Sequence, residues 1–466
     1  MLVASDPARS AAFADALTAV MPAGRVLVGE AVPDDYAHDE ALTVTPVRPA
    51  ILVRPESTAE VAEVLRLADD HGVPVTARGS GTGLSGAAVP DPNGVLISFE
   101  RMAAVLEIDT ENHTATVQPG VTLEQLDAAL APHRLVYPVF PGEYSASLGG
   151  NVATNAGGMR AVKYGVTRHQ VLGLEAVLAG GEVIRTGGKF VKATSGYDLT
   201  QLITGSEGTL AVVTEATLRL YPRLEHTATI LVPFTTLDEV TAAVPRILDR
   251  GVGPLILEYI DLLTMSVVTE FVGLDLGIPE AVRTAALAYL VVQIEQRSAE
   301  RLDEDVAELG ELLADLGALD VYVLPSTAGE KLIEAREKAF WAAKANGADD
   351  IVDIVVPRAS VPEFMARVAE IADEHATWIA GCGHAGDGNV HLSVFQGDPE
   401  TRYAVLRRLF EAGMGLGGAI SGEHGIGTAK RRWYLELEDP AKLALQRRIR
   451  AAFDPNGVLN PGTLLD

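Results

Sequence analysis

Two histidines, His384 and His391, lie seven residues apart in GCGHAGDGNVH, on either side of a glycine-rich turn. The flanking runs WIAGCGH and VHLSVF resemble strands, so we expect a hairpin in which the two imidazole rings converge. A second glycine-rich turn, SGEHGIG, supplies Glu423 and His424. Two histidines and one carboxylate, with an open fourth position, form the ligand set of a catalytic zinc-type site. The spacing alone leaves an alternative, in which the histidines are satisfied by ordinary hydrogen bonds.

A different kind of site is indicated in VPVTARGSGTGLSG, which places Gly81, Gly83 and Gly86 directly after a strand. This spacing, with Glu100 ending the next strand, imitates the dinucleotide fingerprint of a Rossmann fold. The fingerprint requires a helix, but the interval AAVPDPNG holds two prolines and an Asn-Gly turn. We therefore reject the Rossmann interpretation. The loop is then either a structural turn or a phosphate-binding nest of backbone N–H groups.

Two more glycine-rich loops, SLGGNVATNAGG and TGSEGTL, follow in the same half of the chain. Three loops that allow close backbone approach suit a long ligand carrying a pyrophosphate. This favours the phosphate-binding interpretation of the first loop.

The elements that must position these residues mix strands and helices without regular repetition, which predicts an α+β fold. PAILVRPESTAEVAEVLRLADDHGVPVTARG predicts a strand, a helix capped by Ser57 or Thr58 and closed by Gly72, and a second strand. A new pattern begins at TATILVPF, where strands alternate with helices. We expect it to form a sheet with helices on one face.

Composition limits the class of protein. A chain of 466 residues predicts two or three domains, and a net charge of −26 argues against nucleic acid or an anionic membrane as the main partner. The single cysteine, Cys382, excludes an internal disulfide framework and favours a reducing compartment. The start, MLVASDPARSAAFADALTAVM, predicts an amphipathic helix rather than a signal peptide. We expect a cytoplasmic protein with at most peripheral contact to the inner face of the membrane.

The motifs together resemble a known superfamily. ILVRPESTAEVAEVLRLADDHGVPVTARGSGTGLSG, SLGGNVATNAGG, KYGVT and LITGSEGTLAVVTEATLRLYP resemble the FAD-binding domain of the vanillyl-alcohol oxidase / p-cresol methylhydroxylase (PCMH) superfamily. GHAGDGNVH, SGEHGIG and FDPNGVLNPG resemble its FAD-linked D-2-hydroxyacid dehydrogenase branch, which includes D-lactate dehydrogenases and the glycolate oxidase FAD subunit. The resemblance implies four parts: an N-terminal arm (1–45), a PCMH-type FAD-binding domain (46–222), a ferredoxin-like substrate or cap domain (223–419), and a C-terminal segment (420–466) that returns to the flavin.

The resemblance also implies which residues contact FAD. The first loop would wrap the pyrophosphate, the second would line the cofactor further along, and the third would lie near the adenosine end or the ribityl chain. The residues are Arg78, Gly79, Ser80, Gly81, Thr82, Gly83, Leu84 and Ser85; Pro141, Gly142, Ser147, Gly149, Asn151, Asn155, Gly157 and Gly158; and Glu207, Gly208 and Val213. Asn460 is expected near the flavin ring or the metal, with an ordinary turn residue as the alternative. The first loop has no histidine, so FAD should be bound non-covalently.

The same resemblance assigns a divalent metal, zinc or manganese, to His384, His391 and Glu423. A metal bound by the hydroxyl and carboxylate of a 2-hydroxy acid would lower the pKa of that hydroxyl, His424 would accept its proton, and FAD would take the hydride. Arg336 would bind the substrate carboxylate; without the resemblance it would be a surface arginine paired with Glu334 or Glu337.

The implied substrate is a small D-2-hydroxy acid, D-lactate or glycolate. Relatives acting on dicarboxylates carry an extra basic residue where this chain has the acidic and apolar NGADDIVDIVV. The implied electron acceptor is external: a quinone, a cytochrome, an electron-transfer flavoprotein or an iron–sulfur subunit. A homodimer is one expected assembly. Two alternatives are another FAD-linked alcohol oxidase of the superfamily, and the FAD subunit of a multi-subunit glycolate oxidase complex.

Overall fold

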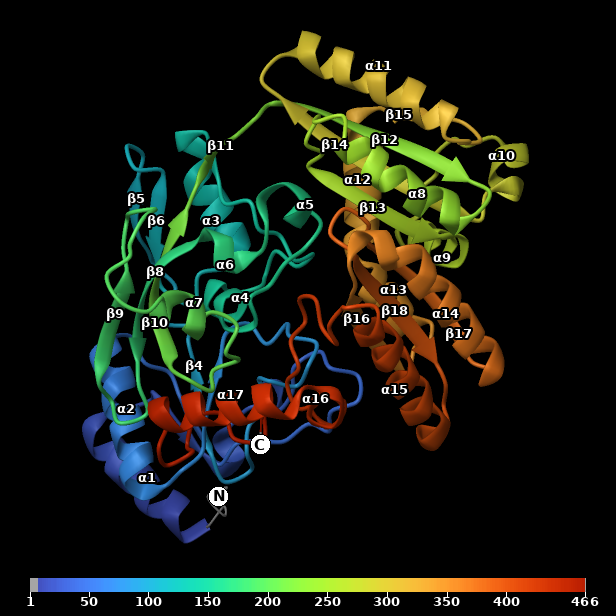
Figure 1. Cartoon of the computed structure of the whole chain (residues 1–466). Coiled ribbons are helices and arrows are strands. Elements are labelled where there is room, and N and C mark those ends of the chain that lie inside the picture. The colour runs from blue at the N-terminus through green and yellow to red at the C-terminus, as the bar shows by residue number, and fades with distance from the viewer. Residues whose placement is uncertain (1–6, 466) are drawn as a thin grey trace.

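The computed structural model describes residues 7–465, which form two lobes (Figure 1). Residues 1–6, the beginning of the predicted N-terminal arm, lie outside the described residues. The first lobe contains three small sheets, and the second is built on one larger sheet. The mixture of helices and strands confirms the predicted α+β class.

The first sheet of the first lobe positions the first glycine loop. Its strand order is β1 (Val26–Val28), β2 (Ile51–Val53), β4 (Val95–Ser98) and β3 (Val75–Arg78). The last three strands run parallel, and β1 is antiparallel to β2. The helices α1 (Pro7–Val20) and α2 (Thr58–His71) pack with this sheet in one core. Ser57 caps α2 by accepting from the backbone N–H of Glu60, and Gly72 ends it in the left-handed conformation, both as predicted.

The second sheet of this lobe is antiparallel and supports the other two glycine loops. Its strand order is β5 (Val105–Asp109), β6 (Thr114–Val117), β10 (Val212–Arg219), β8 (Val171–Val177) and β9 (Val183–Gly187). A two-stranded sheet pairs β7 (Leu135–Val136) with β11 (Tyr221–Pro222). The helices are α3 (Leu123–Leu130), α4 (Leu148–Thr154), α5 (Ala161–Tyr164), α6 (Thr167–Gln170) and α7 (Leu199–Ile203).

The second lobe is an antiparallel sheet of seven strands. Their order is β15 (Tyr322–Leu324), β12 (His226–Phe234), β14 (Ala288–Gln296), β13 (Ile256–Asp261), β17 (Trp378–His384), β18 (Asn389–Phe395) and β16 (Asp350–Val355). The helices that accompany it are α8 (Leu237–Leu248), α9 (Leu262–Val272), α10 (Glu280–Ala285), α11 (Ala299–Asp315), α12 (Ser326–Glu337), α13 (Ala339–Ala345), α14 (Val361–Glu374) and α15 (Pro399–Gly415).

Helices cover both faces of this sheet, so the expectation of one covered face is wrong. Along β12, Ile230 and Val232 join the core formed with α8, α11, α14 and α15, whereas Leu231 joins a separate core with α9 and α12. Both faces of the strand are apolar, and alternate side chains point to opposite faces, so each face must be buried. The second covered face matters because α9, α12 and α13 lie beside the functional site.

The C-terminal segment returns to the first lobe, as predicted. After α15 the chain forms α16 (Arg431–Leu437) and α17 (Pro440–Phe453), drawn in red in Figure 1. The helix α17 lies against the first lobe, and α16 contacts α15 of the second lobe. Leu459 forms a bridge with Val75 of β3, and the backbone N–H of Asn460 donates to the Val75 carbonyl. Among the described residues, no helix is both long and apolar enough to cross a membrane.

Candidate active site

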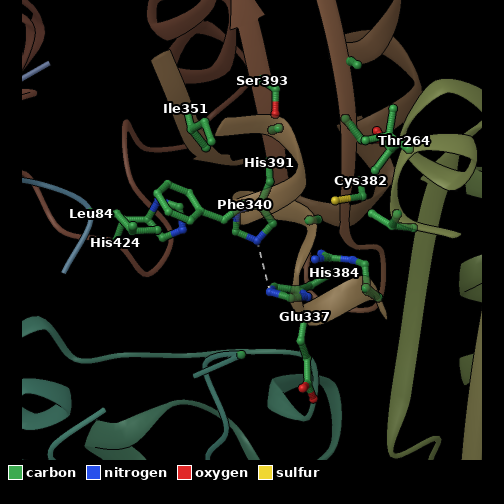
Figure 2. Close-up of a pocket in the computed structure, with 18 of the residues that line it drawn as sticks. Leu84, Thr264, Glu337, Phe340, Ile351, Cys382, His384, His391, Ser393 and His424 are labelled. Atoms are coloured by element: carbon green, nitrogen blue, oxygen red, sulfur yellow. Dashed lines mark hydrogen bonds between the residues drawn. The ribbon is translucent and has the colours of Figure 1, made fainter. Parts of the chain in front are cut away.

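The two histidines converge at the end of the β17–β18 hairpin, as the sequence predicts. The hairpin pairs Cys382 with His391 and His384 with Asn389. The Nε2 atoms of His384 and His391 are 3.1 Å apart (Figure 2). Oε1 of Glu423, from the C-terminal segment, lies 3.1 Å from Nε2 of His384 and 3.3 Å from Nε2 of His391. Two imidazole nitrogens and one carboxylate oxygen that share so small a space fit a divalent cation.

Glu258 fixes the orientation of His384, and sequence reasoning missed it. This fully buried carboxylate on β13 places Oε1 2.5 Å from Nδ1 of His384. Its other oxygen lies 2.7 Å from Nη2 of Arg336. A carboxylate that accepts from Nδ1 leaves Nε2 free to bind a metal. The only signal in the sequence is an acidic residue inside the apolar strand LILEYI.

Arg336 is buried and not on the surface. It lies at the end of α12, is 7% exposed, and its ion-pair partner is Glu258 rather than Glu334 or Glu337. Burial alone would lower the pKa of its guanidinium, but neighbouring negative charges raise it, so Arg336 stays cationic. Within the described structure its Nε has no hydrogen-bond partner. A fixed cation with a spare donor suits a carboxylate ligand.

His424 is held by a second buried carboxylate that sequence reasoning also missed. Asp353 on β16 accepts from the backbone N–H groups of Gly422, Glu423 and His424, at 3.0, 2.8 and 2.8 Å. It also pairs with Lys430, and it lies 3.5 Å from Nδ1 of His424. Burial lowers the pKa of His424 to about 4, although Asp353 opposes this shift. His424 is therefore neutral near pH 7 and able to accept a proton.

An Asp353→Asn variant is expected to lose about 3–5 kcal/mol of unfolding free energy, because Lys430 would be left as an unpaired buried charge. The turn that carries Glu423 and His424 would also lose part of its hydrogen bonding. Urea unfolding measures the first effect, and metal content after dialysis measures the second. The double variant Asp353→Asn/Lys430→Met should recover much of the stability. Equal stability of the single variant and the unchanged protein would contradict the role of Asp353.

Two cavities meet at this site. One is a groove in the first lobe, lined by all three glycine loops. The other lies between α9, α13 and the β17–β18 hairpin, and it is lined by His384, His391 and Arg336. Four residues line both cavities, so the groove leads directly to the cluster of His384, His391 and Glu423. They are Leu84, Pro141, Glu423 and His424.

Most of the predicted cofactor residues line these cavities. Those along the groove are Gly79, Ser80, Gly81, Thr82, Gly83, Leu84, Ser85, Pro141, Ser147, Asn151, Gly157, Glu207 and Gly208. Gly142 and Gly158 line the second cavity. Gly149 and Val213 line a smaller recess beneath the first loop, together with Arg78. Nδ2 of Asn151 is buried without a partner in the described residues, so the groove holds a spare donor for a ligand.

Four predicted cofactor residues serve internal contacts. The side chain of Arg78 donates to the carbonyls of Asp35 and His38, so it braces the N-terminal arm. Asn155 ends α4 and accepts from the backbone of the residue at 168. Glu207 accepts from the backbone N–H groups of residues 426 and 427, which fastens the C-terminal segment to the first lobe.

Asn460 is the fourth residue of this kind. Its amide donates to the carbonyls of Ala87 and Glu207, and its oxygen accepts from Thr76. These bonds hold the C-terminal segment beside the first glycine loop. The position favours the turn alternative for Asn460 over direct contact with a flavin ring.

The first glycine loop depends on Gly81. Its φ is +77°, and an added Cβ would lie 2.0 Å from the guanidinium of Arg78. We expect a Gly81→Ala variant to be purified with much less bound FAD and to lose about 1–2 kcal/mol of stability. The ratio of flavin absorbance to protein absorbance measures the first effect. Gly24→Ala is the matched control, because Gly24 has φ +81° but open space around it. Full flavin content in Gly81→Ala would contradict the assignment of this loop.

Comparison with known proteins agrees with this geometry. Residues 49–187 match the FAD binding domain model, and residues 223–464 match the model for the C-terminal domain of FAD linked oxidases. The chain is a member of the FAD-linked oxidase family. An uncharacterized FAD-linked oxidoreductase of Mycobacterium tuberculosis is 58% identical over 94% of this chain and 96% of its own length.

Two relatives whose names state an activity, and one solved structure, indicate the branch of the family to which this FAD-linked oxidase is similar. D-lactate dehydrogenase of Anaerostipes hadrus is 36% identical over 94% of each chain. Glycolate oxidase subunit GlcD of Bacillus subtilis is 36% identical over 89% of each chain. The structure of p-cresol methylhydroxylase superposes with a TM-score of 0.82 over 98% of this chain and 97% of its own, at 17% identity. The predicted PCMH-type fold and the D-lactate dehydrogenase / glycolate oxidase family are thus confirmed.

Proposed function

We propose that this FAD-linked oxidase is a dehydrogenase that converts a D-2-hydroxy monocarboxylic acid, such as D-lactate, or the achiral glycolate, into the 2-oxo acid. The observation that carries the proposal is the junction of the two cavities at His424. A group that lines both the cofactor groove and the cavity with the metal ligands can act on a substrate held between them.

Each side chain has a role in this proposal. Arg336 binds and orients the substrate carboxylate, and His424 accepts the hydroxyl proton. FAD in the groove would take the hydride from the α-carbon, so substrate loses two electrons and two protons in all. A divalent metal held by His384, His391 and Glu423 would polarise the substrate hydroxyl. Glu258 and Asp353 position these groups without touching the substrate.

The electrons must then leave to an external acceptor. The classes that fit are a quinone, a cytochrome, an electron-transfer flavoprotein or an iron–sulfur subunit. The similarity to a protein named as a glycolate oxidase subunit favours a second candidate, in which this chain is the FAD subunit of such a complex. In that case activity with a natural acceptor would require partner chains, whereas flavin reduction by substrate would not.

Anaerobic flavin reduction tests the proposal. D-lactate, L-lactate, glycolate and D-2-hydroxyglutarate are added separately to the purified protein, with its metal content measured beforehand. We expect bleaching of the flavin by D-lactate and not by L-lactate, and little reduction by the dicarboxylate. Removal of the metal with a chelator should abolish the fast phase, and zinc or manganese should restore it. A bound flavin that none of these acids reduces, with metal present, would refute the proposed reaction.

A further inference from the structure

The cavity that holds Arg336 and the histidines extends well past them along the β17–β18 hairpin. The register places Ala380 opposite Ser393, and Trp378 opposite Phe395, on the strands that carry Cys382 and His391. Side chains two residues apart share one face of a strand, so these pairs follow the Cys382–His391 pair along the same face of the hairpin. We call each cross-strand pair a rung. All six residues line the same cavity. The distance from the first rung, Cys382 and His391, to the last is about 13 Å, four residues of strand.

The opposite wall of this extension is mostly apolar, although Thr264 of α9 and Asn346, just after α13, also line the cavity. It is formed by Val267 and Val268 of α9 and by Phe340 and Ala343 of α13, with Ile351 of β16 at its side. In Figure 2, Ile351 and Ser393 lie on the far side of His391 from Glu337. We call this extension, lined by residues 267, 268, 340, 343, 351, 378, 380, 393 and 395, the apolar arm. Val268 is 1% exposed and Ala380 7%, whereas Trp378 is 74% exposed, so the arm is closed inside and open at Trp378.

Charge and size indicate what the arm holds. Among the described residues lining the cavity, Arg336 is the sole lysine or arginine, and it belongs to the carboxylate end. A second carboxylate in the arm would have no cation to meet it and would be costly to desolvate. The cavity has a volume of about 290 Å³. This is close to the lower end of the about 300–1,000 Å³ that is typical of pockets for drug-sized ligands, so the cavity has room for more than the three-carbon lactate.

We infer that the preferred substrate is a D-2-hydroxy acid with an extended apolar side chain, which lies in the apolar arm while Arg336 holds its carboxylate. This inference rests on the proposed function and replaces its smallest substrates with longer ones. The arm is continuous with the site of reaction, because the pair next to its Ala380–Ser393 rung contains His391, a proposed metal ligand. Its occupant is therefore part of the reacting molecule.

The first experiment measures the second-order rate constant of anaerobic flavin reduction by four acids: D-lactate, D-2-hydroxybutanoate, D-2-hydroxyhexanoate and D-2-hydroxyoctanoate. Burial of each methylene is worth about 0.8 kcal/mol, which corresponds to about fourfold. D-2-hydroxyhexanoate, with three more methylenes than D-lactate, should be about 60-fold better. D-2-hydroxyglutarate, of similar length with a charged end, should be worse than D-lactate. Values that stay flat or fall beyond D-lactate would overturn the inference and leave the proposed function intact.

A variant that fills the arm gives a second test. Ala343→Phe should lower the ratio of kcat/KM for D-2-hydroxyhexanoate to that for D-lactate about tenfold or more. Ala345→Phe is the matched control, because Ala345 lies on the same helix but is exposed and outside the cavity. An unchanged ratio in a folded Ala343→Phe protein would contradict the inference.

Binding of the 2-oxo acid products tests the inference without relying on the reaction. Titration of the FAD-loaded protein with pyruvate and with 2-oxohexanoate, followed by the flavin absorption spectrum, should give a dissociation constant about 60-fold lower for the longer acid. Equal constants would overturn the inference. If no 2-hydroxy acid of any length reduces the flavin, the proposed function itself fails, which is a different outcome from a flat dependence on chain length.

Discussion

A His424→Ala variant will keep its FAD, but D-2-hydroxy acids will reduce that flavin about 10²- to 10⁴-fold more slowly than in the unchanged protein. His424 lines both the glycine-loop groove and the cavity that contains His384 and His391, which is the position that the proposed reaction requires of its base. Its neutral form near pH 7 is the form that can act as a base. Stopped-flow absorbance of the flavin under anaerobic conditions measures the rate constant.

Two controls make this result specific. His133→Ala removes an exposed histidine that lines neither cavity and should leave the rate constant unchanged. Because Glu423 precedes His424, the metal content of His424→Ala must also be measured, and it should match that of the unchanged protein. A rate constant within threefold of the original would show that His424 is not the base. Loss of the rate with intact fold, flavin and metal would support the role of His424 as the base.

The parts of this site that the sequence predicts are those carried by short segments. The hairpin that brings His384 and His391 together consists of seven strand residues on either side of one turn. Each glycine loop is likewise recognisable from a short run of sequence. The strand, capped helix and strand around Ser57 were predictable because capping residues act locally.

The supporting carboxylates were not predictable in this way. Glu258 lies 126 residues from His384, and Asp353 lies 71 residues from His424. Each is an acidic residue in a mostly apolar strand, and only the strand order brings it beside its partner. The apolar arm has the same origin, because its walls come from paired strands and from helices on the sheet face that was expected to be bare. A recognisable loop also does not reveal where each of its side chains points. The side chain of Arg78, at the start of the first glycine loop, contacts the N-terminal arm.

Substitution of Arg336 is expected to produce the second large effect. Arg336→Met should lower kcat/KM for D-lactate about 30- to 5,000-fold, the range for removing one partner of a buried charge pair. Arg336→Lys should recover only part of the loss, because an ammonium group cannot reproduce the two-donor geometry of a guanidinium. Arg297→Met, at an exposed position, is the matched control and should have no effect.

The contact between Arg336 and Glu258 complicates this experiment, because the same carboxylate orients His384, a proposed metal ligand. Loss of activity in Arg336→Met could therefore arise from weaker metal binding. A double-mutant cycle with Glu258→Gln, read out by metal affinity and by kcat/KM, separates the two effects. D-lactamide separates them independently, since it keeps the hydroxyl but lacks the carboxylate. The unchanged protein should prefer D-lactate strongly, and Arg336→Met should lose that preference; if the preference survives, another group binds the carboxylate and Arg336 serves only to hold Glu258 in place.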